Sequence, residues 1–280
     1  MVRKTLKKYA PLLVGKQLST LFLISPKKAL HKAFILFCTP RKGRILPDQE
    51  YFLEEAEDEI ITVNDLYLQT YRWVGYKETI LLVHGWESNS HRWKTLIEKL
   101  NQIGYTVVAF DAPAHGNSSG KILNVPLYAE CLQKIVQLYR PNYMVSHSVG
   151  AMASIFNQYR YQNKEVEKTI ILAPPAELSE IMQNYKTALR FSDKFLTSLN
   201  NFFKEQFGYS FEEFSMPYFA QKITIPGLII HDKYDDIAPY KGSLKIHENW
   251  NDSHLITTEN FGHSLFFDEV DDMIIDFLKD

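Results

Sequence analysis

The feature that most constrains the fold is a sharp turn expected at Ser148. Residues 146–150 read Ser-His-Ser-Val-Gly, directly after an apolar run and directly before a helix-forming run. A serine between a strand and a helix stands on a tight turn, where the backbone passes close to itself. The positions two before and two after the serine must therefore be small, and here they are Ser146 and Gly150. Glycine is usual at both positions, so Ser146 is a departure that requires slightly more room.

Downstream of this turn, two loops carry polar side chains directly after expected strands. The apolar strand 227–230 leads into a loop with three carboxylates, Asp232, Asp235 and Asp236. A later strand leads into a second loop, which contains His263. Because an open α/β sheet binds its ligands at the carboxyl ends of its strands, we expect both loops to lie near the serine turn.

Upstream of the turn, the apolar run 79–83 leads into His84-Gly85-Trp86. Such a segment is either a plain strand-ending turn or a source of backbone N–H groups that stabilise negative charge on an oxygen atom. We favour the second interpretation, because this loop also follows a strand end and is expected at the same edge of the sheet as the serine turn.

Strands and helices alternate along most of the chain. Two strands, 59–64 and 66–74, are expected to form an antiparallel start. The expected parallel strands are 79–83, 105–110, 142–145 and 168–172, and the expected helices between them are about 92–102, 126–139 and 149–159. This alternation predicts an α/β fold with a mostly parallel central sheet and helices on both faces.

Together these segments resemble the α/β-hydrolase superfamily over roughly residues 59–280. The stretch 110–118 also resembles the superfamily's loop after the fourth strand, which borders the active site. The site residues that the resemblance implies are Ser148 as the nucleophile, His263 as the general base, Asp235 as its acid partner, and Trp86 with Val149 as the oxyanion hole. The resemblance cannot name a substrate, because this fold supports many chemistries.

Asp235 is preferred as the acid because the superfamily's acid stands four residues before a proline, here Pro239. Asp232 and Asp236 are then interpreted as loop or surface residues. The other histidines receive ordinary structural interpretations. His147 is expected to pack beside the serine turn, whereas His115, His231 and His254 lie at strand ends or in loops.

These residue types predict a serine hydrolase that cleaves a carboxylic ester or thioester of a small to medium hydrophobic substrate through an acyl-enzyme. The same triad supports a carbon–carbon or amide hydrolase, which sequence cannot separate from the first reading. A third interpretation, from a different class, is a non-catalytic binding protein on a hydrolase scaffold. No histidine spacing typical of a metal site and no glycine-rich nucleotide loop occurs, so we expect no metal and no cofactor.

Length and composition indicate the size of the core and the cellular compartment of the protein. At 280 residues and 45% hydrophobic, the chain is long enough for one sizeable core with an insertion. Two cysteines in unrelated contexts, Cys38 and Cys131, favour a reducing compartment, so we expect a cytoplasmic protein. No apolar run is long enough to span a bilayer. The oligomeric state stays open.

Residues 1–58 are interpreted as a basic helical arm followed by an acidic linker, and 59–280 as the hydrolase domain. Residues 1–47 contain eleven Lys or Arg and no acid. Apolar residues are spaced for two helical faces, Leu6, Tyr9 and Leu13 on one and Leu30, Ala33, Phe34 and Phe37 on another. We favour packing of these faces onto the protein body, and the alternative is peripheral contact with an anionic membrane. A secretory signal and a nucleic-acid role have little support.

The interval from about 175 to 222 is too long for a simple crossover connection. It contains helical patterns near 178–189 and 193–207 and corresponds to the helical lid insertion of the superfamily. Its aromatic residues are Phe191, Phe195, Phe202, Phe203, Phe207, Tyr209, Phe211, Phe214, Tyr218 and Phe219. Most are expected to form a small core, and two or three to face the serine and favour an apolar substrate.

Overall fold

The computed structural model describes residues 2–279 and the side chains of residues 10–279. Contacts within the chain divide it into two compact units. The helical unit consists of the residues up to Thr39 together with Glu177–Ser215. The α/β unit consists of Pro40–Ala176 together with the residues from Met216 onward.

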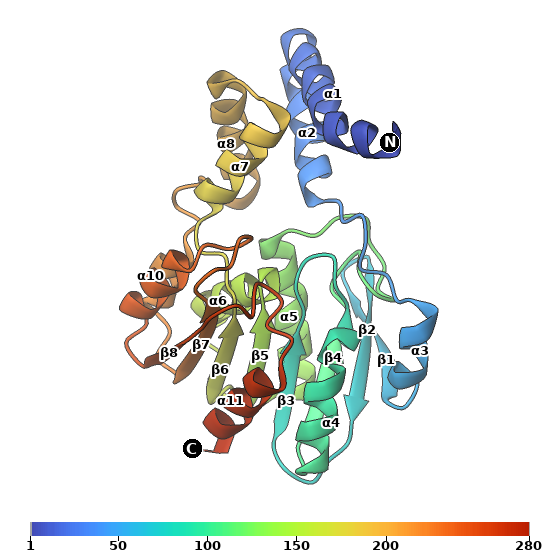
Figure 1. The fold of residues 1–280 in the computed structure, drawn as a ribbon, viewed down its shortest axis with the longest axis vertical. Helices are drawn as coiled ribbons and strands as arrows, with labels where there is room; N and C mark the ends of the chain where they lie inside the picture. Colours follow the sequence, from blue (N-terminus) through green and yellow to red (C-terminus); the bar gives the residue numbers. More distant parts are fainter. Residues whose placement is uncertain (1, 280) are drawn as a thin grey trace. The chain divides into compact units, whose positions relative to one another are not determined.

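Within the described part of the α/β unit, eight strands form one sheet in the order β1-β2-β4-β3-β5-β6-β7-β8 (Figure 1). The strands are β1 (Glu57–Val63), β2 (Leu66–Trp73), β3 (Thr79–Val83), β4 (Thr106–Phe110), β5 (Tyr143–His147), β6 (Lys168–Leu172), β7 (Gly227–Asp232) and β8 (Ser253–Thr258). β2 pairs antiparallel with both β1 and β4, and the other pairs are parallel. The predicted fold class, with its mostly parallel sheet, is therefore confirmed.

Helices cover both faces of this sheet. The helices of the α/β unit are α3 (Pro47–Leu53), the short 3-10 helix η1 (Ser90–Trp93), α4 (Lys94–Gln102), α5 (Val125–Tyr139), α6 (Val149–Tyr161), α9 (Met216–Ala220), α10 (Lys241–Asn249) and α11 (Asp268–Lys279). One apolar core lies between the sheet and helices α4 and α11, and a second lies between the sheet and helices α5 and α6.

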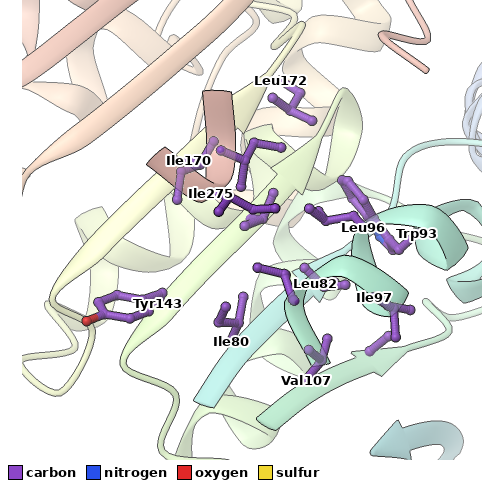
Figure 2. Packing of buried hydrophobic residues seen from close by; sticks show 14 of the residues in the cluster. Ile80, Leu82, Trp93, Leu96, Ile97, Val107, Tyr143, Ile170, Leu172 and Ile275 are labelled. Carbon is purple, nitrogen blue, oxygen red and sulfur yellow. The ribbon is translucent and has the colours of Figure 1, made fainter. Parts of the chain in front are cut away.

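Strand β3 illustrates how the two cores share the sheet. Ile80 and Leu82 belong to the core under α4, where Figure 2 shows them near Leu96 and Ile97. Leu81, between them, belongs to the core under α5. Successive side chains of a strand point to opposite faces, so a parallel strand buried on both faces is continuously apolar. Burial of each such side chain contributes about 1.5–3 kcal/mol, which anchors the strand ends that carry the candidate site.

The helical unit is built from α1 (Val2–Ile24), α2 (Pro26–Cys38), α7 (Leu178–Leu189) and α8 (Asp193–Phe207). The arm and the insertion meet through aromatic rings, because Phe34 of α2 lies edge-on to Phe203 of α8 with ring centroids 5.4 Å apart. The hydroxyl of Tyr185 donates to the carbonyl of Ala33 at 2.9 Å. The arm and the insertion are therefore packed into one unit.

The expected faces of the arm can be compared with this packing. Leu30, Ala33 and Phe34 are buried, whereas the side chains of Leu6 and Tyr9 lie outside the described residues. Helix α3, in the segment interpreted as a linker, belongs to the α/β unit, where Phe52 joins the core under α4. Among the described residues, no helix combines the length and the apolar composition needed to cross a bilayer.

The insertion is divided between the two units. Helices α7 and α8 match the expected ranges and belong to the helical unit, whereas α9 belongs to the α/β unit. Five of the expected aromatic side chains are buried in the helical unit, namely Phe191, Phe195, Phe203, Phe211 and Phe214. Half of the ten aromatic residues thus form a small core in this unit, and a role for the insertion as a lid stays a prediction.

Candidate active site

Ser148 stands on a strained turn between β5 and α6. Its backbone has φ 53° and ψ −121°, a region that side-chain-bearing residues rarely adopt. A Cβ at Gly150 would clash with the carbonyl of His84, so this position must be glycine. Ser146 is buried on the strand side, where its hydroxyl donates to the carbonyl of Ile170 at 3.3 Å. The serine at this position is accommodated because its hydroxyl finds an acceptor on the neighbouring strand.

The structure brings Ser148, His263 and Asp235 into one hydrogen-bonded chain. His263 Nε2 lies 2.9 Å from Ser148 Oγ, and His263 Nδ1 lies 2.7 Å from Asp235 Oδ2. A carboxylate only accepts, so the Nδ1 atom of His263 carries a proton and donates it to Asp235. The Nε2 atom is then left to accept from the serine hydroxyl. Three residues separated by up to 115 positions thus meet at the carboxyl ends of β5, β7 and β8.

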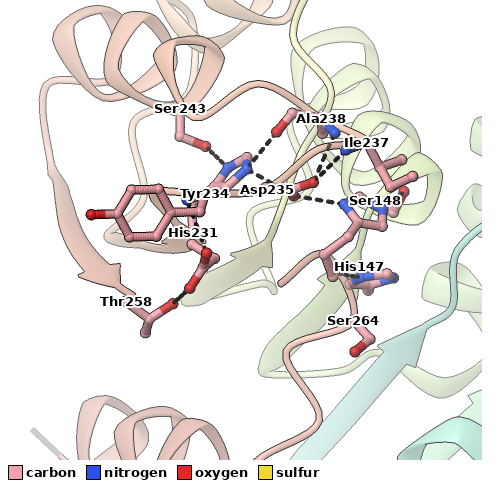
Figure 3. A network of polar contacts seen from close by, with 12 residues as sticks. His147, Ser148, His231, Tyr234, Asp235, Ile237, Ala238, Ser243, Thr258 and Ser264 are labelled. Carbon is pink, nitrogen blue, oxygen red and sulfur yellow. Dashed lines mark hydrogen bonds and ion pairs between the residues drawn. The ribbon is translucent and has the colours of Figure 1, made fainter. Parts of the chain in front are cut away.

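Asp235 is held by more donors than the sequence indicated. Its Oδ1 atom accepts from the backbone N–H groups of Ile237 at 2.8 Å and Ala238 at 3.0 Å (Figure 3). Burial acts to raise the pKa of this carboxyl, but hydrogen bonds from His231, His263 and Ala238 outweigh it and hold the pKa well below its ordinary value. Asp235 is therefore ionised at neutral pH.

His231 is a second histidine on the same carboxylate. It is fully buried, and its Nε2 atom lies 3.1 Å from Asp235 Oδ2 and 2.9 Å from the carbonyl of Ala238 (Figure 3). Since both of those atoms are acceptors, Nε2 carries the proton and Nδ1 accepts from the hydroxyl of Ser243 at 2.6 Å. This contact was not predicted from the sequence. The signal was a histidine four residues before the acid, at a strand end.

Asp232 is the last residue of β7, so its interpretation as a loop or surface residue was wrong. It is fully buried and accepts from the N–H of Phe261 at 2.7 Å, the N–H of Tyr234 at 2.9 Å and the hydroxyl of Thr258 at 3.1 Å. Burial opposes ionisation, yet these bonds hold the pKa of Asp232 below its ordinary value. Asp232 therefore ties the loop of Asp235 to the loop that leads to His263. Asp236 is exposed, as expected.

The loop after β3 lies against Ser148. A Cβ at Gly85 would lie 3.1 Å from the Cβ of Ser148, so the two segments are in close contact. His84 Nε2 accepts from the N–H of Ala112 at 2.9 Å, which leaves Nδ1–H to donate to the Gly85 carbonyl at 2.8 Å. Burial holds the pKa of His84 well below its ordinary value and keeps the ring neutral.

The two hydrogen bonds of His84 fix the orientation of the Trp86 N–H, which is one candidate donor of the oxyanion hole. Because a trans peptide is planar, the N–H of Trp86 points away from the Gly85 carbonyl that His84 holds. The indole of Trp86 lies edge-on to His115, with ring centroids 5.5 Å apart. Val149 is the first residue of α6, so its N–H has no partner within the helix.

His147, beside the nucleophile candidate, is part of a bridge that sequence analysis also missed. Arg92 Nη1 donates to His147 Nδ1 at 2.8 Å, so the proton of the ring is on Nε2, which donates to the carbonyl of His263 at 2.8 Å. Arg92 Nη2 donates to the next carbonyl, that of Ser264, at 3.0 Å. The bridge therefore holds two successive carbonyls of the loop that carries His263.

Both members of this bridge have pKa values altered by burial. The pKa of His147 lies well below its ordinary value because of burial and the positive charge of Arg92, so the ring is neutral. Burial lowers the pKa of Arg92 to about 9. Its guanidinium lies over the rings of Trp93 and Phe266, 4.5 Å and 4.7 Å from their centroids. The arginine is thus held in position by rings as well as by hydrogen bonds.

Among the described side chains of residues 10–279, no group of three His, Cys, Asp or Glu is arranged to hold a metal ion.

Comparisons with known proteins support the fold described above. A family profile described as serine aminopeptidase, S33, matches residues 75–206, which include Ser148 but end before Asp235. The structure of a putative lipase from Acinetobacter baumannii aligns with a TM-score of 0.65 at 17% identity, covering 84% of this chain and 96% of that one. The esterase EaEST from Exiguobacterium antarcticum aligns with a TM-score of 0.62 at 17% identity, covering 80% and 100%. In sequence and in fold, the chain is thus similar to α/β hydrolases.

Curated members of the superfamily match at low identity. Monoacylglycerol lipase ABHD6 of Mus musculus is 23% identical over 258 residues, covering 73% of this chain and 76% of that protein. The AB hydrolase superfamily protein YisY of Bacillus subtilis is 18% identical over 239 residues, covering 70% and 88%. The resemblance noted from the sequence is therefore confirmed at the level of the superfamily.

Proposed function

We propose that this α/β hydrolase is a serine hydrolase that cleaves a carboxylic ester or thioester of a small to medium hydrophobic substrate. The observation that carries the proposal is the hydrogen-bonded chain from Ser148 through His263 to Asp235, beside the loop of Gly85. Support also comes from the names of similar proteins, which include a monoacylglycerol lipase, an esterase and a thioesterase domain.

In the proposed reaction, Ser148 Oγ attacks the carbonyl carbon while His263 Nε2 takes the hydroxyl proton. Negative charge develops on the carbonyl oxygen and is stabilised by the N–H groups of Trp86 and Val149. The tetrahedral intermediate then expels the alcohol or thiol, which receives the proton from His263. Water attacks the acyl-enzyme in the same way, releases the carboxylic acid and restores Ser148.

Asp235 has a different role from His263 in this scheme. Its carboxylate accepts the Nδ1–H of His263, which holds the ring in the tautomer that can take the serine proton. The ionised carboxylate also stabilises the imidazolium that forms after proton transfer. The two backbone N–H groups and His231 that bond to Asp235 keep it ionised and oriented for this task.

The experiment that tests this function is labelling with a fluorophosphonate, followed by mass-spectrometric mapping of the modified residue. We expect label on Ser148 in the wild-type protein and none in Ser148→Ala. Ser146→Ala is a matched control, because it changes a serine two residues away whose hydroxyl faces the neighbouring strand. Label that persists in Ser148→Ala would refute the nucleophile assignment.

A panel of acyl esters and thioesters of graded chain length then identifies the substrate class. We expect turnover of ester or thioester compounds with short to medium acyl chains. An amide hydrolase on the same residues is a second candidate, which the description of the matching family profile as a serine aminopeptidase favours. Aminoacyl amides therefore belong in the panel. A folded wild-type protein that neither labels nor turns over any compound supports a binding protein instead.

A further inference from the structure

One face of α1 is left outside the core of the helical unit. The opposite side packs inward, because Leu18 is buried and a Cβ at Gly15 would clash with the backbone of Leu189. On the outer side, large aliphatic side chains are exposed: Leu13 by 60%, Leu23 by 84% and Ile24 by 79%. Two of these are the most exposed aliphatic side chains among residues 10–279, so the face is not an ordinary solvated surface.

A shallow groove of about 430 Å³ follows this outer face. It is lined by Leu13, Lys16, Gln17, Thr20, Leu21 and Ile24. Spacings of three and four residues place these side chains on one stripe of the helix. Three of these six side chains are aliphatic and one is charged. The stripe lacks the tryptophan, tyrosine and arginine that are enriched at protein-binding hot spots.

The charged side chains of the arm itself have one sign. Four lysines of α1 and α2 are exposed, namely Lys16, Lys27, Lys28 and Lys32. No acidic residue occurs in the chain before Asp48. Two of the acidic residues that the insertion brings to the same unit, Asp193 and Glu213, are paired with lysines of the insertion. Residues 1–39 hold eight Lys or Arg and no acid, and residues 177–215 hold four Lys or Arg and six Asp or Glu. The helical unit therefore has a formal net charge of +6.

We propose that the outer face of α1, with the exposed lysines of α1 and α2, docks on an anionic lipid bilayer. Exposed aliphatic side chains along one side of a helix suit a fluid apolar interface, into which they insert. Lysines beside them attract anionic headgroups. The proposal stands on the surface of the helical unit and does not depend on the proposed ester hydrolysis.

The test is co-sedimentation of the full chain with vesicles of phosphatidylcholine alone or with about 30% phosphatidylserine. We expect binding to the anionic vesicles that is lost at roughly 0.5 M NaCl. The combined change Lys16→Glu, Lys27→Glu and Lys28→Glu should reduce binding at least about tenfold, as should Leu13→Ser, Leu23→Ser and Ile24→Ser.

Matched controls change the same residue types in the α/β unit. Lys121, Lys134 and Lys164 are exposed there, as are Ile60, Val74 and Leu138, and their changes to Glu and Ser should leave binding unaltered. Circular dichroism verifies folding. If the triple serine variant loses helix, the pair Leu23→Ser and Ile24→Ser replaces it, because these two side chains are the most exposed.

Three outcomes overturn the proposal. The first is a wild-type protein that binds neither kind of vesicle. The second is binding to anionic vesicles that is unchanged in both the triple glutamate variant and the triple serine variant. The third is a wild-type protein that does not bind vesicles but forms a dimer in sedimentation velocity, where the variant with Leu13→Ser, Leu23→Ser and Ile24→Ser is a monomer. A second copy of the chain would then cover this face. None of these readouts uses enzymatic activity, so failure here leaves the proposed hydrolase function standing.

Discussion

Two buried aspartates three positions apart hold different parts of the candidate site. Asp235 accepts from His263 and from two backbone N–H groups of its own loop. Asp232 accepts from the backbone of Phe261, two residues before His263. The same residue type therefore serves once as the partner of the candidate base and once as the support of its loop. The difference comes from which hydrogen-bond donors the fold brings to each carboxylate.

The roles of the neighbouring aspartates can be separated by mutation. Asp235→Asn should preserve the fold but reduce ester turnover by roughly four orders of magnitude, because an amide no longer favours the tautomer of His263 that accepts the serine proton. Asp236→Asn is the matched control and should change turnover little, since Asp236 is exposed. The measurement is kcat/KM on the best ester, with thermal unfolding as the check on folding. A larger loss of turnover in Asp236→Asn than in Asp235→Asn would show that Asp236, and not Asp235, is the acid partner of His263.

The bridge from Arg92 through His147 makes a second prediction. Arg92→Gln should lower kcat about tenfold to a hundredfold with little change in KM. The substitution weakens the bridge that holds the carbonyls of His263 and Ser264, so the imidazole of His263 shifts from its reactive position. Arg92→Lys should restore only part of the loss, since one ammonium cannot make both bonds in the geometry of a guanidinium.

Lys94→Gln is the control for the arginine variants, because it removes a half-exposed cation two residues away. Stopped-flow kinetics that separate kcat from KM, together with the rate of fluorophosphonate labelling, provide the readout. A variant at Arg92 that melts earlier but keeps the kcat of the wild type would make the bridge a purely structural feature.

Among the elements, α4 and α11 meet beside the loop that carries His263. Lys99 of α4 lies 3.0–3.5 Å from three carboxylates at the start of α11, those of Asp268, Asp271 and Asp272. A cavity of about 320 Å³, lined by Arg92 and Asp271 among others, lies between these helices. Negative charge at a helix N-terminus is favourable. Asp271 is partly buried, however, and burial disfavours the charged carboxylate, so the helix position and the burial have opposite effects on its ionisation.

The opposition at Asp271 predicts how stability depends on pH. Burial, with the negative charges of Asp268 and Asp272, raises the pKa of Asp271 from 3.8 to about 6, against the attraction of Lys99. The folded protein therefore binds a proton that the unfolded chain has released, and the free energy of unfolding falls as pH rises from about 4 to about 6. Asp271→Asn removes this loss.

The expected gain for Asp271→Asn is about 1 kcal/mol above pH 7, reduced by solvent screening, and close to zero near pH 4. Urea unfolding at several pH values measures it. Asp272→Asn removes a more exposed carboxylate from the same lysine and should show no such pH-dependent gain. A gain for Asp271→Asn that is the same at pH 4 and pH 7 would exclude the raised pKa as its cause.

On the scale of the whole molecule, the parallel sheet collects residues from distant parts of the chain at one edge. The strands β5, β7 and β8 end in the three loops that carry Ser148, Asp235 and His263. The helical unit is assembled in a similar way, because an arm at the start of the chain packs on an insertion that begins at Glu177. In the α/β unit, segments that are far apart in sequence form the candidate site. In the helical unit, such segments form the core.

Local sequence patterns were sufficient for the fold class and the serine turn. The resemblance to the superfamily indicated Asp235 and His263, two of the residues that lie beside this turn. Alternating strands and helices specify a parallel sheet, and such a sheet places strand ends together whatever the loops contain. The helices of the insertion were also predictable, since Ser192 at one end of α8 and Gly208 at the other are ordinary helix boundaries.

Only the tertiary structure decided which partners the polar side chains have. The bonds of His231, Arg92 and Asp232 join residues up to 172 positions apart, and no local pattern identifies the partner of each. The packing of the arm on the insertion was likewise decided by three-dimensional contacts, because an apolar helical face shows that a helix must be covered but not by what. Periodicity is a property of neighbouring residues, whereas hydrogen-bond partners depend on how remote segments meet.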